Sequence, residues 1–400
     1  MSNTWKIYLL AVASFLVGTS ENIIAGILDK VAADIGVSVS AAGQLITVFS
    51  LAYAFGTPVI MAALARMERR KLLLYSLAMF IIGNLLAVTL SGYSFLIGSR
   101  IILALSTGVF VVTALTVASK LAPPDKQGSA IATLVMGFST SLIVGVPLGR
   151  VIASAYDWQM IFGGIGVLGL LAMLAIAWII PRTEGEQPVP VRDQIALLKQ
   201  PKIAAALLIT FFWIAGYSIT YTYISPFLLT VTGMSEQGVS AGLFAFGIAS
   251  LLGSKLGGYG TDRWGVSRTL VGGMLLHTLA LLALSFAAHS PAAMFPLLML
   301  WAFSAWSSGP TQQYNLILLA PQASGIMLSL NSSVLQLAMA AGAGIGGIVV
   351  QQASLAAISW IGAAGVAVAA LMAAASLRRT RSSSASRQES QEIALQKAGT

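Results

Sequence analysis

Two charged side chains lie inside apolar stretches of this sequence and are the residues best placed to carry chemistry. Glu21 stands in "FLVGTSENIIAGIL" (15–28), with no Lys or Arg within eight positions of it, and Arg100 stands in "GSRIILALSTG" (98–108). A charge at the centre of a membrane helix costs about 2.5–3.5 kcal/mol on insertion scales, so such residues usually serve a function. We therefore treat Glu21 and Arg100 as candidates for proton coupling.

The elements that must position these charges are membrane-spanning helices. The 400 residues are 57% hydrophobic and only 9% charged, whereas about a quarter of the residues in a soluble protein are charged. Apolar stretches of roughly 20 residues, the length that spans a bilayer, recur along the chain without the alternation of barrel strands. We predict an all-α membrane protein with about twelve transmembrane helices, over 5–28, 41–63, 72–91, 94–118, 128–151, 159–180, 203–228, 238–257, 269–288, 292–313, 324–350 and 354–377.

An internal repeat predicts two six-helix halves. An offset of 197 residues aligns Gly56 with Gly253, Gly145 with Gly342, and Gly149 with Gly346. Two similar halves that rock about a central site are typical of secondary transporters. We predict an N-terminal bundle over 1–180, a cytoplasmic linker over 181–202, a C-terminal bundle over 203–377 and a disordered cytoplasmic tail over 378–400.

The distribution of basic residues predicts the orientation. Most of the 22 Lys and Arg residues fall in loops and tails on one side, and the loops on the other side hold only Lys30. The positive-inside rule then places both termini in the cytoplasm. The same bias explains the net charge of +9, so no nucleic-acid partner is expected. Arg150 and Lys255 lie near helix ends, and we interpret both as interfacial side chains.

The composition also excludes several classes of chemistry. The chain has no cysteine, and its two histidines, His277 and His289, are not at the spacing of metal ligands. No phosphate-binding glycine loop and no arrangement of nucleophile and base is present. We expect no enzyme activity, no cofactor and no metal site.

Four motifs in order give the sequence a family resemblance. They are "GTSENIIAGILDKVAADIGVSVSAAGQLITVFSLAYAFGTP" (18–58), "GSRIILALSTG" (98–108), "GFSTSLIVGVPLG" (137–149) and "GGYGTDRWGVSR" (257–268). Together they resemble the twelve-helix drug/proton antiporter branch of the major facilitator superfamily, in particular its arabinose-efflux-like and chloramphenicol-efflux-like permeases. The resemblance covers residues 5–377 and implies alternating access.

Two of these motifs imply mechanical roles. The loop at 257–268 looks like the family's cytoplasmic latch, which would consist of Gly258, Asp262, Arg263 and Arg268; the alternative is an ordinary positive-inside turn. The motif at 137–149 supplies Gly145, Pro147 and Gly149, and the repeat supplies Gly342 and Gly346. The resemblance implies that these residues form a packing seam between the halves on the outer side, whereas the alternative is ordinary close helix packing.

The predicted depths of Glu21 and Arg100 match. At 1.5 Å per residue, both lie roughly 9–10 Å below the outer surface, so they are able to face each other. The repeat gives no second copy of the pair, because Ser218 and Leu297 occupy the equivalent positions. Desolvation raises the pKa of a carboxyl group and a nearby cation lowers it. A change in burial or in the distance to Arg100 would therefore make Glu21 bind or release a proton. A fixed structural ion pair is the alternative.

A second group of polar and aromatic residues within the predicted spans is the candidate substrate surface. Trp213, Tyr217 and Tyr221 are spaced by four residues and share a helix face, which suits flat or hydroxylated molecules or interhelical packing equally well. Polar groups in membrane helices usually face the bundle interior. The remaining candidates are Asn22, Gln44, Trp306, Asn331 and Gln336.

These observations predict a proton-coupled exporter of small neutral or weakly cationic organic molecules. We expect a monomer in a bacterial inner membrane, with drug-like compounds, sugars or purine nucleosides as substrates. The alternatives are a proton-coupled uptake symporter and a non-transporting membrane receptor or scaffold.

Overall fold

The computed structural model describes residues 3–90, 92–123, 126–184 and 197–376, and within these ranges it is helical throughout. It contains 12 helices long and apolar enough to cross a membrane. The first six spans are α1 (Asn3–Gly26), α3 (Val39–Ala63), α4 (Arg69–Thr89), α5 (Tyr93–Leu121), the fifth span (α6, Gln127–Thr140, with α7, Val146–Ala155), and α8 (Gln159–Ile179). The last six are α10 (Pro201–Tyr221), α12 (Glu236–Trp264), α13 (Val266–Phe286), α14 (Pro291–Leu319), α15 (Ser324–Gln352) and Leu355–Ser376. The all-α prediction is confirmed.

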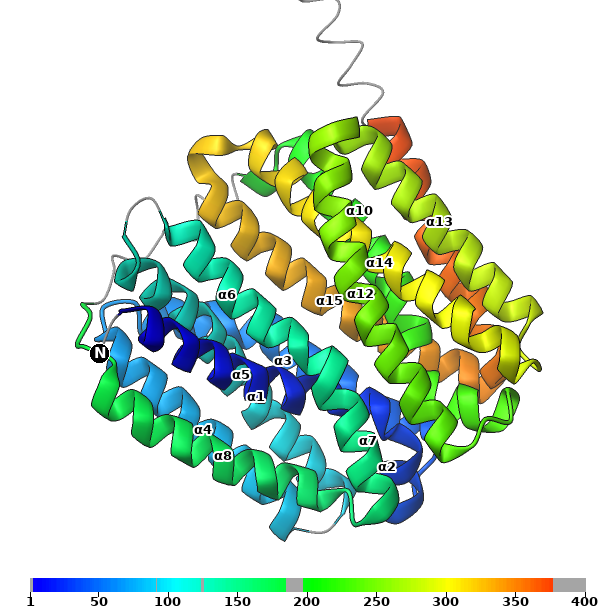
Figure 1. Ribbon diagram of the computed structural model, residues 1–400, viewed down its shortest axis with the longest axis horizontal. Coiled ribbons are helices and arrows are strands. Elements are labelled where there is room, and N and C mark those ends of the chain that lie inside the picture. Colours follow the sequence, from blue (N-terminus) through cyan, green and yellow to red (C-terminus); the bar gives the residue numbers. More distant parts are fainter. Residues whose placement is uncertain (1–2, 91, 124–125, 185–196, 377–400) are drawn as a thin grey trace, which may run out of the picture.

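The spans gather into two groups in chain order. Figure 1 shows the first six spans (blue to green) beside one another, with the last six (green to red) on the opposite side of the molecule. We call the end of the bundle where α1 begins the Asn3 side and the opposite end the Arg150 side. Residues 185–196 of the predicted linker and the whole predicted tail lie outside the described residues.

The seventh span is shorter than the sequence predicts. Residues 222–228 belong to the predicted span, but α10 ends at Tyr221 and the chain continues through α11 (Ile224–Pro226) into a π-helical turn, η3 (Phe227–Val231). Pro226 has no N–H for a helical hydrogen bond, which accounts for the break. The regular span therefore ends at Tyr221, and α11 contacts α1 and α2 of the first half.

The fifth span is also interrupted. A π-helical turn, η2 (Ser141–Gly145), connects α6 to α7, and Pro147 follows within the first turn of α7. A Cβ atom on Gly145 or Gly149 would overlap Thr19 or Ile23 of α1, so glycine permits α1 and the fifth span to touch. This seam joins two helices of the same half.

The glycines of α15 form a matching seam within the other half. A Cβ atom on Gly342 would lie 2.5 Å from the Ala215 carbonyl oxygen, and one on Gly346 would lie 2.6 Å from Tyr223 Cε2. The packing seam that the resemblance implies between the halves is thus found inside each half. Close approaches between the halves are made by other glycines, Gly43 against Tyr223 and Gly247 against Ile143.

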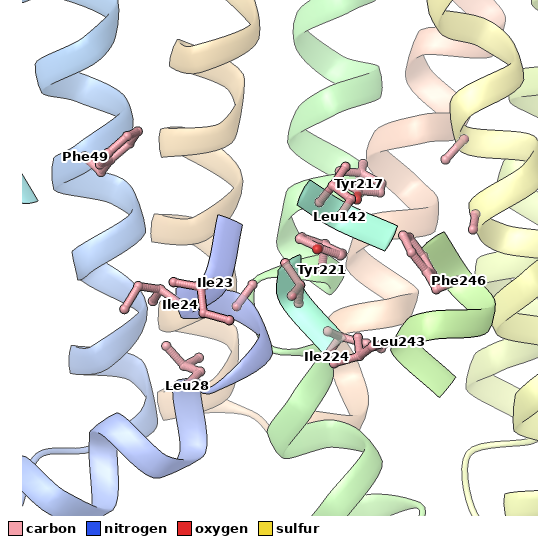
Figure 2. Close-up of a cluster of buried hydrophobic side chains, with 14 of the residues drawn as sticks. Ile23, Ile24, Leu28, Phe49, Leu142, Tyr217, Tyr221, Ile224, Leu243 and Phe246 are labelled. Atoms are coloured by element: carbon pink, nitrogen blue, oxygen red, sulfur yellow. The ribbon is translucent and has the colours of Figure 1, made fainter. Parts of the chain in front are cut away.

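Buried apolar side chains from both halves form one continuous cluster. Figure 2 shows part of it, where α1, α2 (Leu28–Ile35) and η2 meet α10, α11 and α12. Burial of apolar surface in this cluster favours contact between the halves over separation, although helix packing within a bilayer depends more on shape complementarity than it does in water. The labelled members are Ile23, Ile24, Leu28, Phe49, Leu142, Tyr217, Tyr221, Ile224, Leu243 and Phe246.

Candidate functional site

A cavity of about 300 Å³ lies between the halves, which is large enough for a small organic molecule. Helices α1, α3, α5 and α6 line one side, and α10, α14 and α15 line the other. Leu115, near the end of α5, and Asn331, near the start of α15, belong to the lining, and both helix ends lie on the Asn3 side. The cavity therefore extends from mid-bundle towards the Asn3 side.

Glu21 lies at the inner end of this cavity and connects the two halves. Its Oε1 accepts a hydrogen bond of 3.0 Å from Gln336 Nε2 of α15. Its Oε2 is buried and has no hydrogen-bond partner among the described residues, and the same holds for Gln336 Oε1. Both atoms belong to residues that line the cavity, so they are available to a ligand or a proton that enters it.

Arg100 is fully enclosed close to Glu21 and does not pair with it. Its Nη1 donates 3.0 Å to the Ser20 carbonyl oxygen, and its guanidinium lies 4.7 Å from the centre of the Phe162 ring, a cation–π distance. Arg100 and Glu21 border the same small void, and no ion pair within 4.0 Å joins these two described residues. In this conformation the two charges are neighbours without a direct bond.

The aromatic stripe on α10 is prepacked. The rings of Tyr217 and Tyr221 stack with centroids 5.1 Å apart at an interplanar angle of 16°. Trp301 lies 5.6 Å from Tyr217, and its indole Nε1 donates 2.8 Å to His277 Nε2. These contacts hold the two tyrosine rings as a flat surface beside the cavity.

Most of the predicted substrate residues meet at the cavity. Gln44 does not, because it lies beside Gly347 where α3 and α15 touch on the Arg150 side. Sequence reasoning missed Tyr53, Gln312 and Gln313, which also line the cavity; their polar groups within predicted spans were the available signal. The predicted residues that line it are Glu21, Asn22, Trp213, Tyr217, Tyr221, Trp306, Asn331 and Gln336.

Amide side chains of the C-terminal half form a hydrogen-bonded network at the cavity wall. Gln312 Nε2 donates to the Ala206 carbonyl oxygen at 2.6 Å and to Thr210 Oγ1 at 3.0 Å. Thr210 in turn donates 3.0 Å to Asn331 Oδ1, and Asn315 donates 3.3 Å to Gln312 Oε1. The network fixes two cavity-lining amides, Gln312 and Asn331, on helices α14 and α15.

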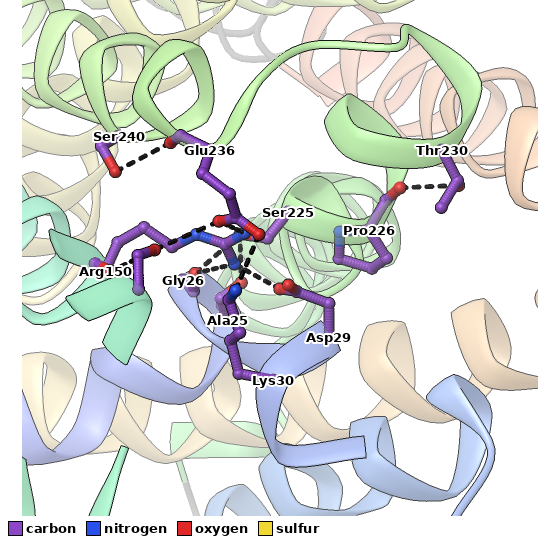
Figure 3. Close-up of polar contacts among 11 residues, drawn as sticks. Ala25, Gly26, Asp29, Lys30, Arg150, Ser225, Pro226, Thr230, Glu236 and Ser240 are labelled. Atoms are coloured by element: carbon purple, nitrogen blue, oxygen red, sulfur yellow. Dashed lines mark hydrogen bonds and ion pairs between the residues drawn. The ribbon is translucent and has the colours of Figure 1, made fainter. Parts of the chain in front are cut away.

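A cluster of charges closes the Arg150 side (Figure 3). Arg150 has no exposed side-chain surface, contacts Asp29, and donates 2.6 Å from Nη2 to Glu236 Oε2. Lys30 Nζ lies 2.7 Å from Glu236 Oε1. Because Glu236 begins α12 and the other three residues belong to the first half, the ion pairs that Glu236 makes with Arg150 and Lys30 join the halves.

The position of Arg150 corrects its interpretation as an interfacial side chain. Rather than reaching into the headgroups, Arg150 turns inward, where its Nη1 also donates 3.0 Å to the Gly26 carbonyl oxygen. Ser225 reinforces the same junction, since its hydroxyl donates to the carbonyl oxygens of Ala25 at 2.9 Å and Gly26 at 3.0 Å. A buried guanidinium group is costly without partners, and here the opposite half supplies the partner of Nη2, while Nε has none among the described residues.

The predicted latch loop lies on the Asn3 side and is open in this conformation. Asp262, Arg263 and Arg268 are exposed, and Arg263 donates 2.7 Å to the Tyr259 hydroxyl on its own helix. A Cβ atom on Gly258 would meet nothing within 4 Å. The polar contacts that hold the halves together are thus concentrated on the Arg150 side.

Comparison with known proteins identifies the family. Residues 10–343 match the Major Facilitator Superfamily. The chain belongs to this superfamily. It is therefore a multi-pass membrane protein and a secondary transporter of a small molecule, and it is not an enzyme.

Several relatives match nearly the whole chain. The uncharacterized MFS-type transporter YbcL of Bacillus subtilis is 58% identical over 92% of this chain and 95% of its own length. The inner membrane transport protein YdhP of Escherichia coli K12 is 31% identical over 88% of this chain and 90% of its own length. A "Probable sugar efflux transporter" of Helicobacter acinonychis is 28% identical over 90% and 92%.

A solved structure shares the fold of this superfamily member. The crystal structure of a bacterial homologue of the human lysosomal transporter Spinster, in an inward-facing and occupied conformation, matches with a TM-score of 0.75. The match covers 94% of this chain and 97% of that one at 15% sequence identity. At that identity the comparison concerns the arrangement of the helices alone.

Proposed function

We propose that this protein is a proton-coupled exporter of small neutral or weakly cationic organic molecules, a member of the drug/proton antiporter branch. Glu21 binds the proton, and the cavity between the halves binds the substrate. The observation that carries the proposal is the unpartnered carboxylate oxygen of Glu21 at the inner end of the cavity. Proton and substrate can compete for this oxygen, which is the requirement for exchange by alternating access.

The basic loops support a cytoplasmic location for the Asn3 side. The positive-inside rule assigns that side, with both termini, to the cytoplasm. The relative from Escherichia coli is named an inner membrane transport protein, and we propose the same bacterial membrane and a monomeric state here. The cavity then faces the cytoplasm, from which an exporter takes its substrate.

The charged cluster supports a role in alternating access. Access from the other side requires the halves to part where Glu236 meets Arg150 and Lys30. Ion pairs that form in one state and break in the other bias the equilibrium between them. On the Asn3 side, Asp262, Arg263 and Arg268 are the residues that would join the halves in the opposite state.

Transport assays in inverted membrane vesicles test the proposal. An imposed gradient with an acid interior should drive uptake of a drug-like or nucleoside probe into the vesicle, and Glu21→Gln should abolish this uptake. Glu21→Asp, which keeps a carboxyl, is the matched control. Unchanged gradient-driven uptake by Glu21→Gln would overturn the role of Glu21.

The same assay separates the alternatives. A proton-coupled uptake symporter uses the same carboxylate but moves substrate with the protons, so an acid interior would drive substrate out of the vesicle. A membrane receptor or scaffold would bind the probe without any gradient-driven movement. A cavity on the Asn3 side is expected in the cycle of an exporter and of a symporter alike, so the direction of gradient-driven movement decides between them.

A further inference from the structure

The two walls of the cavity differ in chemistry at positions that the internal repeat makes equivalent. With the offset of 197 residues that relates Gly56 to Gly253, Leu115 corresponds to Gln312 and Leu134 to Asn331, and all four line the cavity. Three further pairs also line it, namely Val135 with Ser332, Phe138 with Leu335, and Leu142 with Met339. Both halves therefore present the same repeat positions, and at three of the five only the C-terminal half is polar.

The wall formed by α5, α6 and η2 is apolar. Val111, Leu115, Leu134, Val135 and Phe138 are aliphatic or phenyl side chains without hydrogen-bonding atoms. A hydroxyl group pressed against them loses its water and gains no partner, which is unfavourable. This wall accepts the apolar face of a molecule and rejects a polar one.

The opposite wall offers hydrogen bonds at fixed places. Trp213 is 6% exposed and Gln336 8% exposed, and both line the cavity. The Trp213 indole Nε1 is a donor without a hydrogen-bond partner among the described residues, and Gln336 Oε1 is an acceptor in the same condition. The stacked rings of Tyr217 and Tyr221 follow Trp213 on α10. The Trp306 indole Nε1 and the Tyr217 hydroxyl also lack a partner among the described residues, so several hydrogen-bonding groups and a flat aromatic surface lie on the same side.

Charge is confined to the inner end. Among the residues that line the cavity, Glu21 is the charged one. No cationic side chain is among the described residues that line the cavity, and Arg100 borders only the separate small void next to Glu21. The cavity thus disfavours anions on both walls.

We propose that the cavity takes a one-sided amphipathic molecule. Its apolar body packs against Leu115 and Leu134, and a single hydrogen-bonding edge meets Trp213 and Gln336. A free sugar fits less well, because hydroxyls surround its ring and some must face the apolar wall. The proposal rests on the proposed function in that it takes the cavity as the substrate site, and it sets this chain apart from the relative named for sugar efflux.

Binding to the full chain in lipid nanodiscs, without any gradient, tests the proposal. The probes are phenyl β-D-glucoside and D-glucose, which share the sugar and differ by the apolar group, with empty nanodiscs as the blank for partition into lipid. We expect the phenyl glucoside to bind at least about tenfold more tightly, the discrimination that added apolar groups give in a hydrophobic pocket. Equal affinities would overturn the proposal.

Variants of the apolar wall attribute the preference to this site. Leu115→Gln should reduce the affinity ratio of the two probes several-fold, whereas Leu115→Met, which conserves volume, should leave it unchanged. If Leu115→Gln does not fold, Val135→Thr supplies a nearly isosteric polar change at a position that lines the cavity and is 50% exposed. A ratio that neither polar variant alters would overturn the assignment.

The outcomes separate this inference from the proposed function. Selective binding of the phenyl glucoside without gradient-driven movement in inverted vesicles would support the amphipathic site and contradict proton-coupled export. Gradient-driven movement of free glucose, with equal affinities for the two probes, would support export and contradict the amphipathic site.

Discussion

Glu21 and Arg150 are both charged residues of the first half, but their surroundings differ. Arg150 contacts Asp29, Glu236 and the Gly26 carbonyl oxygen, so acids on two elements neutralise it. Glu21 receives one hydrogen bond from Gln336 and keeps a buried oxygen without a partner. The ion pairs of Arg150 join two surfaces, although its Nε has no partner among the described residues, whereas Glu21 has no ion pair there and its free oxygen lies at the cavity. This difference is what distinguishes a structural contact from the site that we propose for the proton.

The largest expected effect is the loss of gradient-driven transport when Glu21 is replaced. Glu21→Gln preserves the shape and the possibility of a bond to Gln336 but removes the titrating group, so transport driven by a pH gradient should fall to the level of empty vesicles. Substrate exchange without a gradient should persist, because binding does not require the proton. Loss of both activities together would show that Glu21 serves structure rather than coupling.

The next effect concerns the ion pairs between Glu236 and the first half. Glu236→Gln removes both ion pairs between the halves and should shift the equilibrium towards opening on the Arg150 side. Glu236 is 36% exposed, so we expect a shift of about 1–2 kcal/mol, or roughly 5–30-fold in population, rather than the full cost of breaking a buried pair. The chain has no native cysteine, so labelling of Leu243→Cys by an impermeant maleimide reports this opening directly.

Asp29→Asn is the matched control for that measurement. Asp29 also contacts Arg150, but both residues belong to the first half, so this contact does not join the halves. Labelling of Leu243→Cys should rise much less in Asp29→Asn than in Glu236→Gln. Equal increases would mean that the cluster stabilises the first half rather than the junction.

A smaller effect should follow from loss of the contact between Gln336 and Glu21. Gln336→Leu removes one hydrogen bond to a charged group, worth about 1.5–3 kcal/mol where fully buried and less beside an open cavity. Labelling of Leu243→Cys should increase, but less than in Glu236→Gln. If it increased more, the inner end of the cavity and not the charged cluster would be the main closure.

The smallest of the contacts between the halves is neutral. Ser225→Ala removes hydrogen bonds to the Ala25 and Gly26 carbonyl oxygens, and a neutral hydrogen bond contributes about 0.5–1.5 kcal/mol. A slight rise in labelling is expected. Thr230→Ala is its control. Among the described residues, the Thr230 hydroxyl donates to the Pro226 carbonyl oxygen within the same half (Figure 3), so this change should leave labelling unchanged.

The fold was largely predictable from sequence because the apolar composition of the chain determines where the helices lie. Twelve apolar stretches of bilayer length require twelve helices, and the structure contains them. The exception at residues 222–228 shows the limit, since apolar composition alone does not reveal that Pro226 and a π-helical turn end the regular span.

The site was predictable only in part because its decisive contacts are made between distant segments. The isolated charge of Glu21 marked it from sequence, and helical spacing marked Tyr217 and Tyr221. Nothing local to Arg150 reveals that Glu236, 86 residues further along and in the other half, neutralises it. For the same reason Gln44 was placed at the cavity although it lies where α3 meets α15.

The partial exposure of the Arg150 cluster makes its ion pairs sensitive to dissolved salt. Lys30 and Glu236 are 29% and 36% exposed, so dissolved ions reach this pair, while Arg150 remains enclosed. At physiological ionic strength charges are screened over about 8 Å, and at 1 M over about 3 Å. Salt on the Arg150 side should therefore loosen these contacts slightly, and a small rise in labelling of Leu243→Cys in concentrated sodium chloride would measure it. Such a rise would make the ionic strength of the medium on that side one of the variables that set how often the halves part.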